Sequence, residues 1–165
     1  MPKAHFARYF RYYHPYLPFL DAGTSPHEYY ESSELLFWAI ISVSARRLQS
    51  LPTLLPKLAR SVTDLLWKHL RAIPYTIRAV HGLILLCTWP FPTSSSMTDP
   101  TFMLVGMMMQ IGTQMGLHRA LSAEDFSKVP LSLDAYEYSE WVRTWLTCNI
   151  VAQRSVERSL LHLPV

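Results

Sequence analysis

Charge is scarce in this sequence. Charged residues make up 16% of its 165 residues, whereas a typical domain has about 25%. Hydrophobic residues make up 50%, while disordered chains are rich in charge and poor in apolar residues. The composition therefore excludes disorder over the whole length, and the length suits one domain with a sizeable core.

Cysteine and long apolar runs are scarce as well. Cys87 and Cys148 lie in separate apolar segments, so a disulfide framework is excluded and buried, unreactive thiols are expected. The longest apolar segment, 102–117, has 16 residues and contains Gln110 and Gln114, whereas a membrane span needs about 20 predominantly apolar residues. The N-terminus lacks the continuous apolar stretch of a signal peptide. We therefore expect an intracellular, soluble protein with no membrane span.

The signatures of common catalytic and metal sites are missing. The sequence contains no G-x-G-x-x-G, no P-loop, no H-E-x-x-H, no C-x-x-C and no G-x-S-x-G. No two of the seven histidines stand three or four residues apart, the spacing that a helical metal site uses. Glu137 and Glu140 share a helix face but are expected to form solvated ion pairs beside Arg143. We therefore predict no catalytic residue, no metal site and no cofactor, and an enzyme is the least favoured class.

The sequence does contain residue patterns that typically begin helices. Ser25-Pro26-His27-Glu28 has the pattern of a capping box with proline at the first helical position. Asp99-Pro100 has the pattern of an N-cap followed by proline. No segment alternates with the period of two that is typical of strands, so the predicted fold class is all-α, a helical bundle. The predicted helices cover 26–49, 53–70, 75–89, 101–116 and about 132–157.

Two of these helices carry specific predictions about the core. Segment 101–116 is apolar on nearly every side, which places it at the centre of the bundle. Its Gly106 and Gly112 are expected to let neighbouring helices approach closely. The predicted core face of the last helix consists of Tyr136, Trp141, Trp145, Leu146 and Ile150.

The N-terminal segment 6–19 interleaves aromatic and basic residues. Its aromatic residues Phe6, Tyr9, Phe10 and Tyr13 stand at helical spacing, which favours a stripe packed into the core. The alternative is a stacking platform for single-stranded nucleic acid.

Charge is distributed unevenly along the chain. Residues 46–78 contain seven cations and one anion, and residues 121–140 contain one cation and five anions. Solvated helix faces are the favoured interpretation, and the alternative is that these surfaces dock on each other or on a partner.

Four segments, read in order, resemble a known family. They are YFRYYHPYLPFLD, LLFWAIISVSARR, PYTIRAVHGLILLCTWPFP and DPTFMLVGMMMQIGTQMGLHR. The order resembles the middle homology (regulatory) region of fungal zinc binuclear cluster transcription factors, in the branch with the secreted-protease activator and the leucine-biosynthesis regulator. The resemblance covers roughly residues 6–153. Its motif positions are Ala45, Arg46, Trp89, Pro90, Gly116, Leu117, His118 and Arg119.

The resemblance implies an all-helical regulatory domain, located in the nucleus, that controls an attached DNA-binding module by ligand, partner or self-masking. The family's DNA-binding module holds two zinc ions with six cysteines. This chain has two, so we expect neither zinc binding nor direct DNA binding from residues 1–165. We expect a truncated domain that needs a protein partner or missing parts of the same polypeptide, and a small-molecule effector is possible.

The motif residues themselves are predicted to be structural. Gly116 suits the left-handed position that ends a helix, and Leu117 can then fold back onto it. His118 and Arg119 fall where cations favour a helix C-terminus.

A second interpretation is a stand-alone helical binding module for an apolar small molecule or a protein partner. Methionine provides adaptable apolar surface, although core packing is the commoner use. The methionines that could line such a pocket are Met97, Met103, Met107, Met108, Met109 and Met115.

Overall fold

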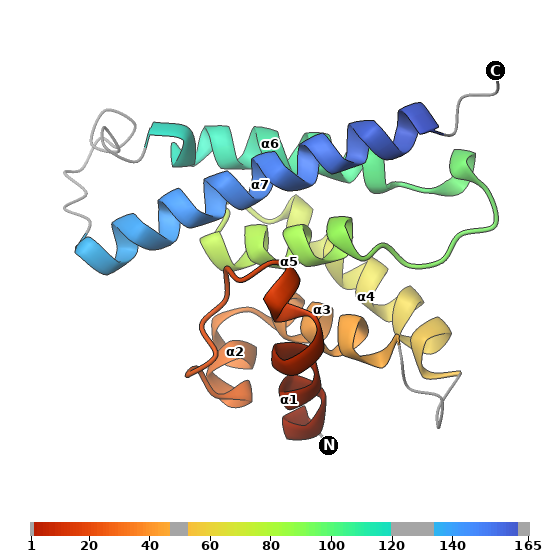
Figure 1. Ribbon diagram of the computed structural model, residues 1–165, viewed down its shortest axis with the longest axis horizontal. Coiled ribbons are helices and arrows are strands. Elements are labelled where there is room, and N and C mark those ends of the chain that lie inside the picture. The colour runs from red at the N-terminus through yellow and green to blue at the C-terminus, as the bar shows by residue number, and fades with distance from the viewer. Residues whose placement is uncertain (1, 47–52, 120–133, 162–165) are drawn as a thin grey trace.

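The computed structural model describes residues 2–46, 53–119 and 134–161 (Figure 1). Over these residues the chain forms α-helices and two short 3-10 helices and no strand, which confirms the all-α prediction. The elements are α1 (Pro2–Tyr12), η1 (His14–Tyr16), α2 (Pro26–Ser32), α3 (Glu34–Ala45), α4 (Leu54–Arg71), α5 (Ile77–Thr88), η2 (Ser96–Thr98), α6 (Thr101–Gln114) and α7 (Ala135–Leu161). The acidic segment 121–140 lies mostly outside the described residues.

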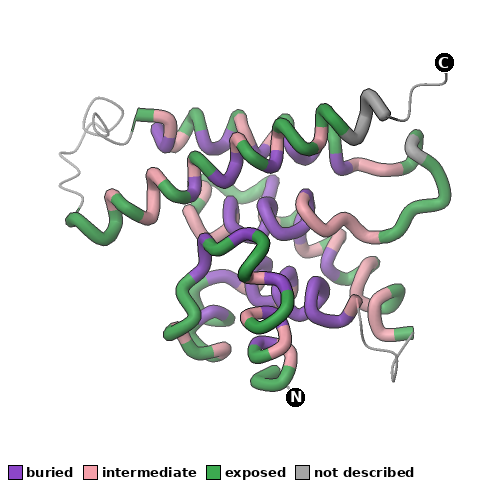
Figure 2. The backbone as a smooth tube through the Cα atoms, in the orientation of Figure 1, coloured by how far each residue is buried: buried purple, intermediate pink, exposed green. Residues whose placement is uncertain are grey.

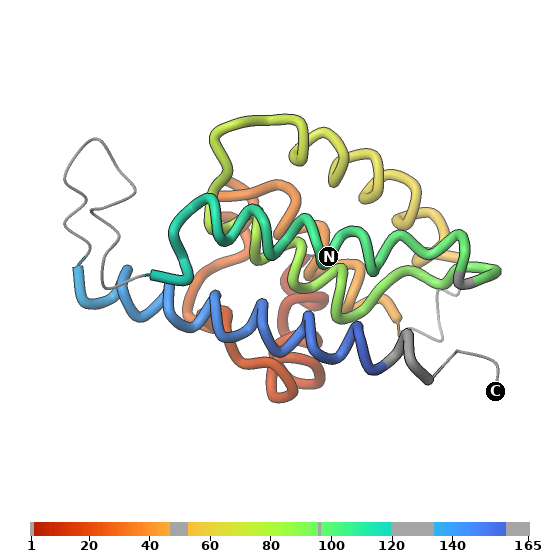
Figure 3. Tube along the Cα trace, turned by 90° about the horizontal axis from the view of Figure 1, so that it is seen from above, coloured from red at the N-terminus to blue at the C-terminus, as the bar shows by residue number. Residues whose placement is uncertain are grey.

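Helix α5 occupies the middle of the molecule. It packs against α3 on one side and against α6 and α7 on the other, and α3 in turn contacts α1, α2 and α4 (Figures 1 and 3). Burial is concentrated along α3 and α5 (Figure 2), where 10 and 8 of 12 residues respectively are buried. Both helices carry almost no charge, so neighbouring elements can cover each of them on most sides without burying an unpaired charged group.

The prediction that segment 101–116 forms the centre is wrong. Helix α6 lies in an outer layer, where α5 and α7 cover one side of it. On its other side Phe102 is 62% exposed and Met103 is 49% exposed. The apolar sequence therefore marks a helix that is covered on one face within the described structure.

Glycine allows close packing at the α3–α5 contact. A Cβ atom added to Gly82 would lie 2.9 Å from Cγ of Leu35, so no larger residue fits without displacement. The predicted role is correct for Gly112, where an added Cβ would lie 3.3 Å from the Trp145 ring. It is wrong for Gly106, which has no atom within 4 Å of that position because it faces outward.

The described part of the predicted helix 26–49 forms two helices, α2 and α3. The capping box at its start is confirmed: the Ser25 hydroxyl accepts from the Glu28 N–H, and Glu28 Oε2 accepts from the Ser25 N–H at 2.7 Å. At Ser33 the backbone is extended, with φ of −165°, and the Ser33 hydroxyl caps α3 by accepting from the Leu36 N–H. A serine side chain that bonds the backbone three residues on competes with continuation of the first helix.

Helix α1 packs as the spacing predicted. Phe6, Tyr9 and Tyr13 are buried, and Phe10 is half-buried against the same core. The aromatic stripe thus faces the protein interior rather than solvent.

The predicted core face of the last helix is partly wrong. Trp141 and Trp145 are half-buried against the core, but Tyr136, Leu146 and Ile150 are 56%, 58% and 43% exposed. The face that α7 buries is formed by Thr144, Thr147, Cys148 and Val151. The two threonine hydroxyls each donate to the carbonyl four residues earlier at 2.7 Å, so their burial leaves no unpaired hydroxyl proton.

Candidate functional site

The motif residues gather first where α3 and α5 end. Arg46 directly follows α3, and its guanidinium donates to the carbonyl oxygen of Trp89 at 2.8 Å and to that of Pro90. These carbonyls stand just beyond the last residue of α5, where a helix leaves its C-terminal acceptors without intrahelical partners. The cation therefore joins two helix ends and complements the negative end of α5. Ala45 is buried beside it.

Trp89 extends this junction to α1. Its ring meets the Tyr13 ring edge-on, with centroids 5.6 Å apart, and Tyr13 stacks on Tyr9. One cluster thus connects α1, the end of α3 and the end of α5. Its groups hydrogen-bond and pack, and none of them is a nucleophile or an acid–base pair.

The remaining motif residues lie where α6 ends, at the opposite end of the α5–α6 pair (Figure 1). Gly116 has φ of 81°, a left-handed conformation that favours glycine. The Leu117 side chain is buried and approaches Gly112, and the Arg119 N–H donates to the Gly116 carbonyl. The His118 ring lies 5.8 Å from the Trp145 ring of α7. The structure therefore places the eight motif positions in two separate clusters.

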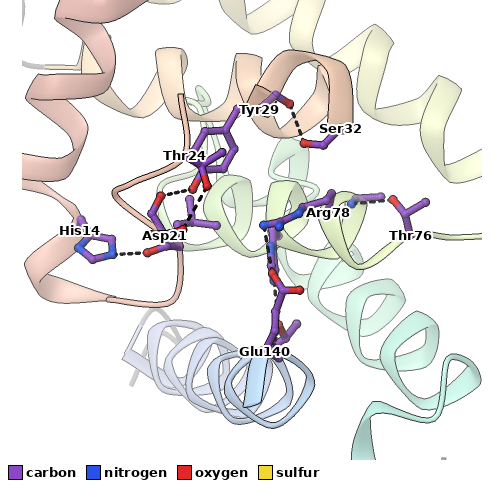
Figure 4. Close-up of polar contacts among 12 residues, drawn as sticks. His14, Asp21, Thr24, Tyr29, Ser32, Thr76, Arg78 and Glu140 are labelled. Carbon is purple, nitrogen blue, oxygen red and sulfur yellow. Dashed lines mark hydrogen bonds and ion pairs between the residues drawn. The ribbon is translucent and has the colours of Figure 1, made fainter. Parts of the chain in front are cut away.

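The sequence did not predict two groups of polar contacts, one around Asp21 and Tyr29 and the other between α5 and α7 (Figure 4). Arg78 of α5 and Glu140 of α7 form an ion pair at 3.1 Å, and the two side chains are 24% and 16% exposed. Tyr29 donates to the Asp21 carbonyl at 2.6 Å, and burial raises the pKa of its hydroxyl. The expected solvated pairing of Glu140 with Arg143 is wrong, because α5 supplies a partner from 62 residues away.

Glu137 has a different role from the one predicted. Its Oε2 accepts from the Asp134 N–H at 3.1 Å, and Asp134 Oδ1 accepts from the Glu137 N–H at 2.7 Å. This reciprocal pair caps the start of α7, which explains why an acidic pair stands there.

His81 of α5 is a fully buried ionisable group. Its Nε2 lies 2.7 Å from the Thr144 hydroxyl, which already donates to the Glu140 carbonyl, so Nε2 carries the proton and donates. Burial, with the nearby Arg78 and Arg143 charges, lowers the pKa of His81 to about 3. The imidazole is therefore neutral at neutral pH.

The two cysteines behave as predicted. Both are free and buried, and burial raises the pKa of each thiol to about 12. At neutral pH the thiolate, which is the reactive form, is therefore absent.

Two cavities lie along α4. The first, of about 460 Å³, is an open groove between α3 and α4, lined by Glu34, Trp38, Leu58, Ser61, Val62, Asp64, Leu65 and Lys68. The second is more enclosed, measures about 240 Å³ and lies between α4, the end of α5 and the start of α6. We name it the α4–α6 cavity, and its lining consists of Thr63, Leu66, Trp67, Leu86, Pro90, Phe91, Thr93, Thr98, Asp99, Pro100, Thr101 and Leu104. None of the six methionines predicted to line a pocket lines either cavity.

The described residues provide neither a metal centre nor a membrane-spanning helix. No group of three or more His, Cys, Asp or Glu side chains there could hold a metal ion. No helix among them is long and apolar enough to cross a membrane.

These geometries define an all-helical domain whose motif residues join helix ends rather than arrange reactive groups. The chain belongs to the family of the fungal specific transcription factor domain, whose pattern matches residues 7–151. The match spans all seven helices that the structure describes, with α1 and α7 covered in part.

Curated relatives carry the same region. SEF1 of Kluyveromyces lactis is 32% identical over 155 residues, which cover 91% of this chain and 13% of that protein. SEF1 of Candida albicans, named a transcriptional regulatory protein, is 32% identical over 91% of this chain and 16% of its own length. LEU3 of Saccharomyces cerevisiae, named a regulatory protein, is 29% identical over 86% of this chain and 17% of its own. The chain thus spans less than a fifth of each of these relatives. No solved structure matches it.

The zinc cluster that the family resemblance implies does not fit the residues present. Such a cluster takes its ligands as thiolates, whereas Cys87 and Cys148 are two protonated, buried thiols with no further cysteine in the sequence.

Proposed function

We propose that this chain is a helical regulatory region of a nuclear transcription regulator, which controls an attached DNA-binding module rather than binding DNA or performing catalysis itself. The observation that carries the proposal is the family match over residues 7–151, which coincides with the helical body. The names of the relatives, SEF1 as a transcriptional regulatory protein and LEU3 as a regulatory protein, support it.

The arrangement of motif residues supports a regulatory rather than an enzymatic role. The Arg46 hydrogen bonds join the end of α3 to the end of α5. Beyond the turn at Gly116, His118 packs against Trp145 of α7. Residues that fix how helices meet determine which surface a domain presents to the rest of a protein. We infer that control operates through this surface, by a protein partner, another part of the same polypeptide or a small-molecule effector.

Exposed apolar side chains support a need for a partner. Phe102 on α6 and Leu146 on α7 are 62% and 58% exposed, in the outer layer of the fold. Exposed large apolar groups are costly in isolation and are commonly covered in an assembly.

A reporter experiment tests the proposal. We expect that the chain, fused to a heterologous DNA-binding module in yeast, changes reporter output relative to the module alone. Arg46→Met should remove most of that change, because it deletes the charged hydrogen bonds to Trp89 and Pro90. Hydrogen bonds of this kind contribute about 1.5–3 kcal/mol to stability. Arg60→Met, which removes an exposed cation of α4, is the matched control and should leave both output and stability unchanged.

The regulatory assignment would be contradicted if the fusion gave the same reporter output as the module alone and a fluorescent fusion of the chain were found in the cytoplasm.

Sequencing full-length transcripts of the locus tests directly whether a DNA-binding module is attached. An in-frame C-x2-C-x6-C upstream of Met1 is the expected result, and a transcript that lacks any such module would overturn that part of the proposal.

A further inference from the structure

We propose that the α4–α6 cavity binds a small aromatic molecule that carries a hydrogen-bond donor. The binding stands on the cavity's own chemistry. Its use as an effector site rests on the proposed function.

The walls of the cavity determine the apolar part of the ligand. Leu66, Leu86 and Leu104 form a buried aliphatic lining, and the half-buried residues Trp67 and Phe91 add aromatic rings to it. Aromatic rings pack favourably edge-on or offset against such walls. Ligand pockets typically measure about 300–1,000 Å³, so a cavity of about 240 Å³ suits a single-ring compound rather than a larger one.

The polar lining determines the head group. Asp99 is the single charged side chain on the lining, and no lysine or arginine lies on it. Asp99 Oδ1 already accepts from the Thr101 N–H at 2.9 Å and from the Thr101 hydroxyl, which leaves Oδ2 to accept from a ligand. A hydroxyl or amine can donate to this oxygen, whereas a carboxylate would be repelled and would lose its hydration without compensation.

The position of the cavity connects it to the motif residues. Pro90 lines it, and the Pro90 carbonyl is one of the two acceptors of the Arg46 guanidinium. The cavity is also bounded by α4, by the end of α5 and by the first turn of α6. A ligand seated there contacts three helices at once and stabilises the arrangement that Arg46 holds. This is how occupancy would reach the surface of the domain.

The larger groove between α3 and α4 is the weaker candidate. It is more open to solvent, and its charged lining has both signs, from Glu34, Asp64 and Lys68. Solvated charges of opposite sign at an open groove select no particular ligand class. The groove nevertheless supplies a control, because Ser61 of α4 lines it while Thr63, two residues on, lines the α4–α6 cavity.

The test uses the 165-residue chain and three single-ring probes of matched size: benzyl alcohol, benzylamine and benzoate. We expect saturable thermal stabilisation by benzyl alcohol and benzylamine, since a ligand that binds the folded state raises its stability with concentration. Benzoate should give none. In amide NMR spectra, the shifts caused by the first two probes should concentrate at Trp67, Phe91 and Leu104.

Two substitutions of α4 locate the site. Thr63→Phe places a ring in the cavity and should weaken benzyl alcohol binding by about tenfold or more. Ser61→Phe places the same ring in the α3–α4 groove and should leave binding unchanged. Circular dichroism melts of both variants verify that each is folded, and the NMR shifts of the unsubstituted chain locate the site independently of either variant.

Any one of four results would overturn the inference. Two concern binding: benzoate binds as tightly as the other probes or more tightly, or a folded Thr63→Phe variant still binds benzyl alcohol. The other two are NMR shifts confined to another part of the chain and the lack of any saturable effect at millimolar probe. These assays contain no promoter and no reporter. They can therefore fail while the regulatory assignment stands, and they can succeed where the reporter experiment fails.

Discussion

At the scale of single residues, His81 shows how burial fixes a protonation state. It sits against Phe19 and donates to Thr144, and its Nδ1 has no hydrogen-bond partner among the described residues. Charging the ring would place a cation in the interior beside two arginines that already lower its pKa. The folded state therefore binds this proton far less readily than the unfolded chain does.

This difference predicts a loss of stability in mild acid. The pKa of His81 is about 3 in the folded protein against 6.5 for the free side chain, so the unfolded state gains the proton first as the pH falls. The contribution is complete above pH 6.5 and declines from there towards pH 3. Between pH 7.5 and 5 the free energy of unfolding should fall by about 2 kcal/mol from this group alone.

Urea unfolding at several pH values measures this effect. The matched variant His81→Gln cannot titrate in this range, so it should be less stable at neutral pH but lose about 2 kcal/mol less than the parent between the two pH values. Parallel pH profiles for the two proteins would show that His81 is not the group responsible.

Sequence reasoning found residues whose role is local and missed those whose role depends on distant partners. The Ser25–Glu28 capping box is defined within four residues and was predicted correctly. The Arg78–Glu140 pair joins positions far apart in the sequence, and no local pattern specifies it. The Arg46 contacts are of the same kind: the family resemblance marked Arg46, Trp89 and Pro90, but only the fold brings them together.

At the scale of helices, the crossing of α3 and α5 depends on the absence of a side chain. Leu35 is 1% exposed and fills the space that a Cβ atom of residue 82 would need. Leu35 is held on all sides, so it cannot move aside at low cost.

Gly82→Ala and Gly106→Ala should consequently have opposite effects. Both replace a glycine inside a helix, a change that is worth up to about 1 kcal/mol in favour of alanine. At Gly106 nothing obstructs the new methyl group, so stability should rise by about that amount. At Gly82 the clash with Leu35 should outweigh it, and overpacking typically costs about 1–3 kcal/mol.

Thermal unfolding of the two single variants measures the change in stability at each position, and each variant is the control for the other. Stabilisation at both positions would mean that α3 and α5 are less tightly packed than the structure indicates.

The helices themselves were more predictable than the faces they bury. Spacing indicated a helix at 132–157, but α7 carries apolar residues on two sides, and spacing alone cannot choose between them. The side that is buried contains Thr144 and Thr147, whose hydroxyls are satisfied within the helix. The side with Leu146 and Ile150 is exposed because no described element covers it. Likewise, the apolar character of α6 could not reveal which of its faces has a neighbour.

At the scale of the whole molecule, the outer layer formed by α6 and α7 determines how the chain behaves in solution. Phe102, Met103, Leu146 and Ile150 expose large apolar side chains there, while α3 and α5 are covered. Apolar surface of this kind favours association between molecules.

We expect the chain to associate as its concentration rises, and Phe102→Glu combined with Leu146→Glu should reduce this association. Both residues are already exposed, so the double variant should retain the helical content and melting behaviour of the parent. Sedimentation velocity at increasing concentration measures the effect.

A control of equal charge distinguishes loss of apolar surface from simple repulsion. Ala4→Glu combined with Ala72→Glu adds the same charge at exposed positions away from α6 and α7. It should leave association largely unchanged. Equal effects of the two double variants would place the cause in net charge instead of the outer layer.

The central place of α5 has a mechanical consequence. Both layers share this one helix, because α5 packs against α3 on one side and against α6 and α7 on the other. Close-packed interiors transmit displacement rather than absorb it. A displacement of α5 would therefore move both layers together. A change that begins in the layer of α3 can in this way reach α6 and α7 through α5.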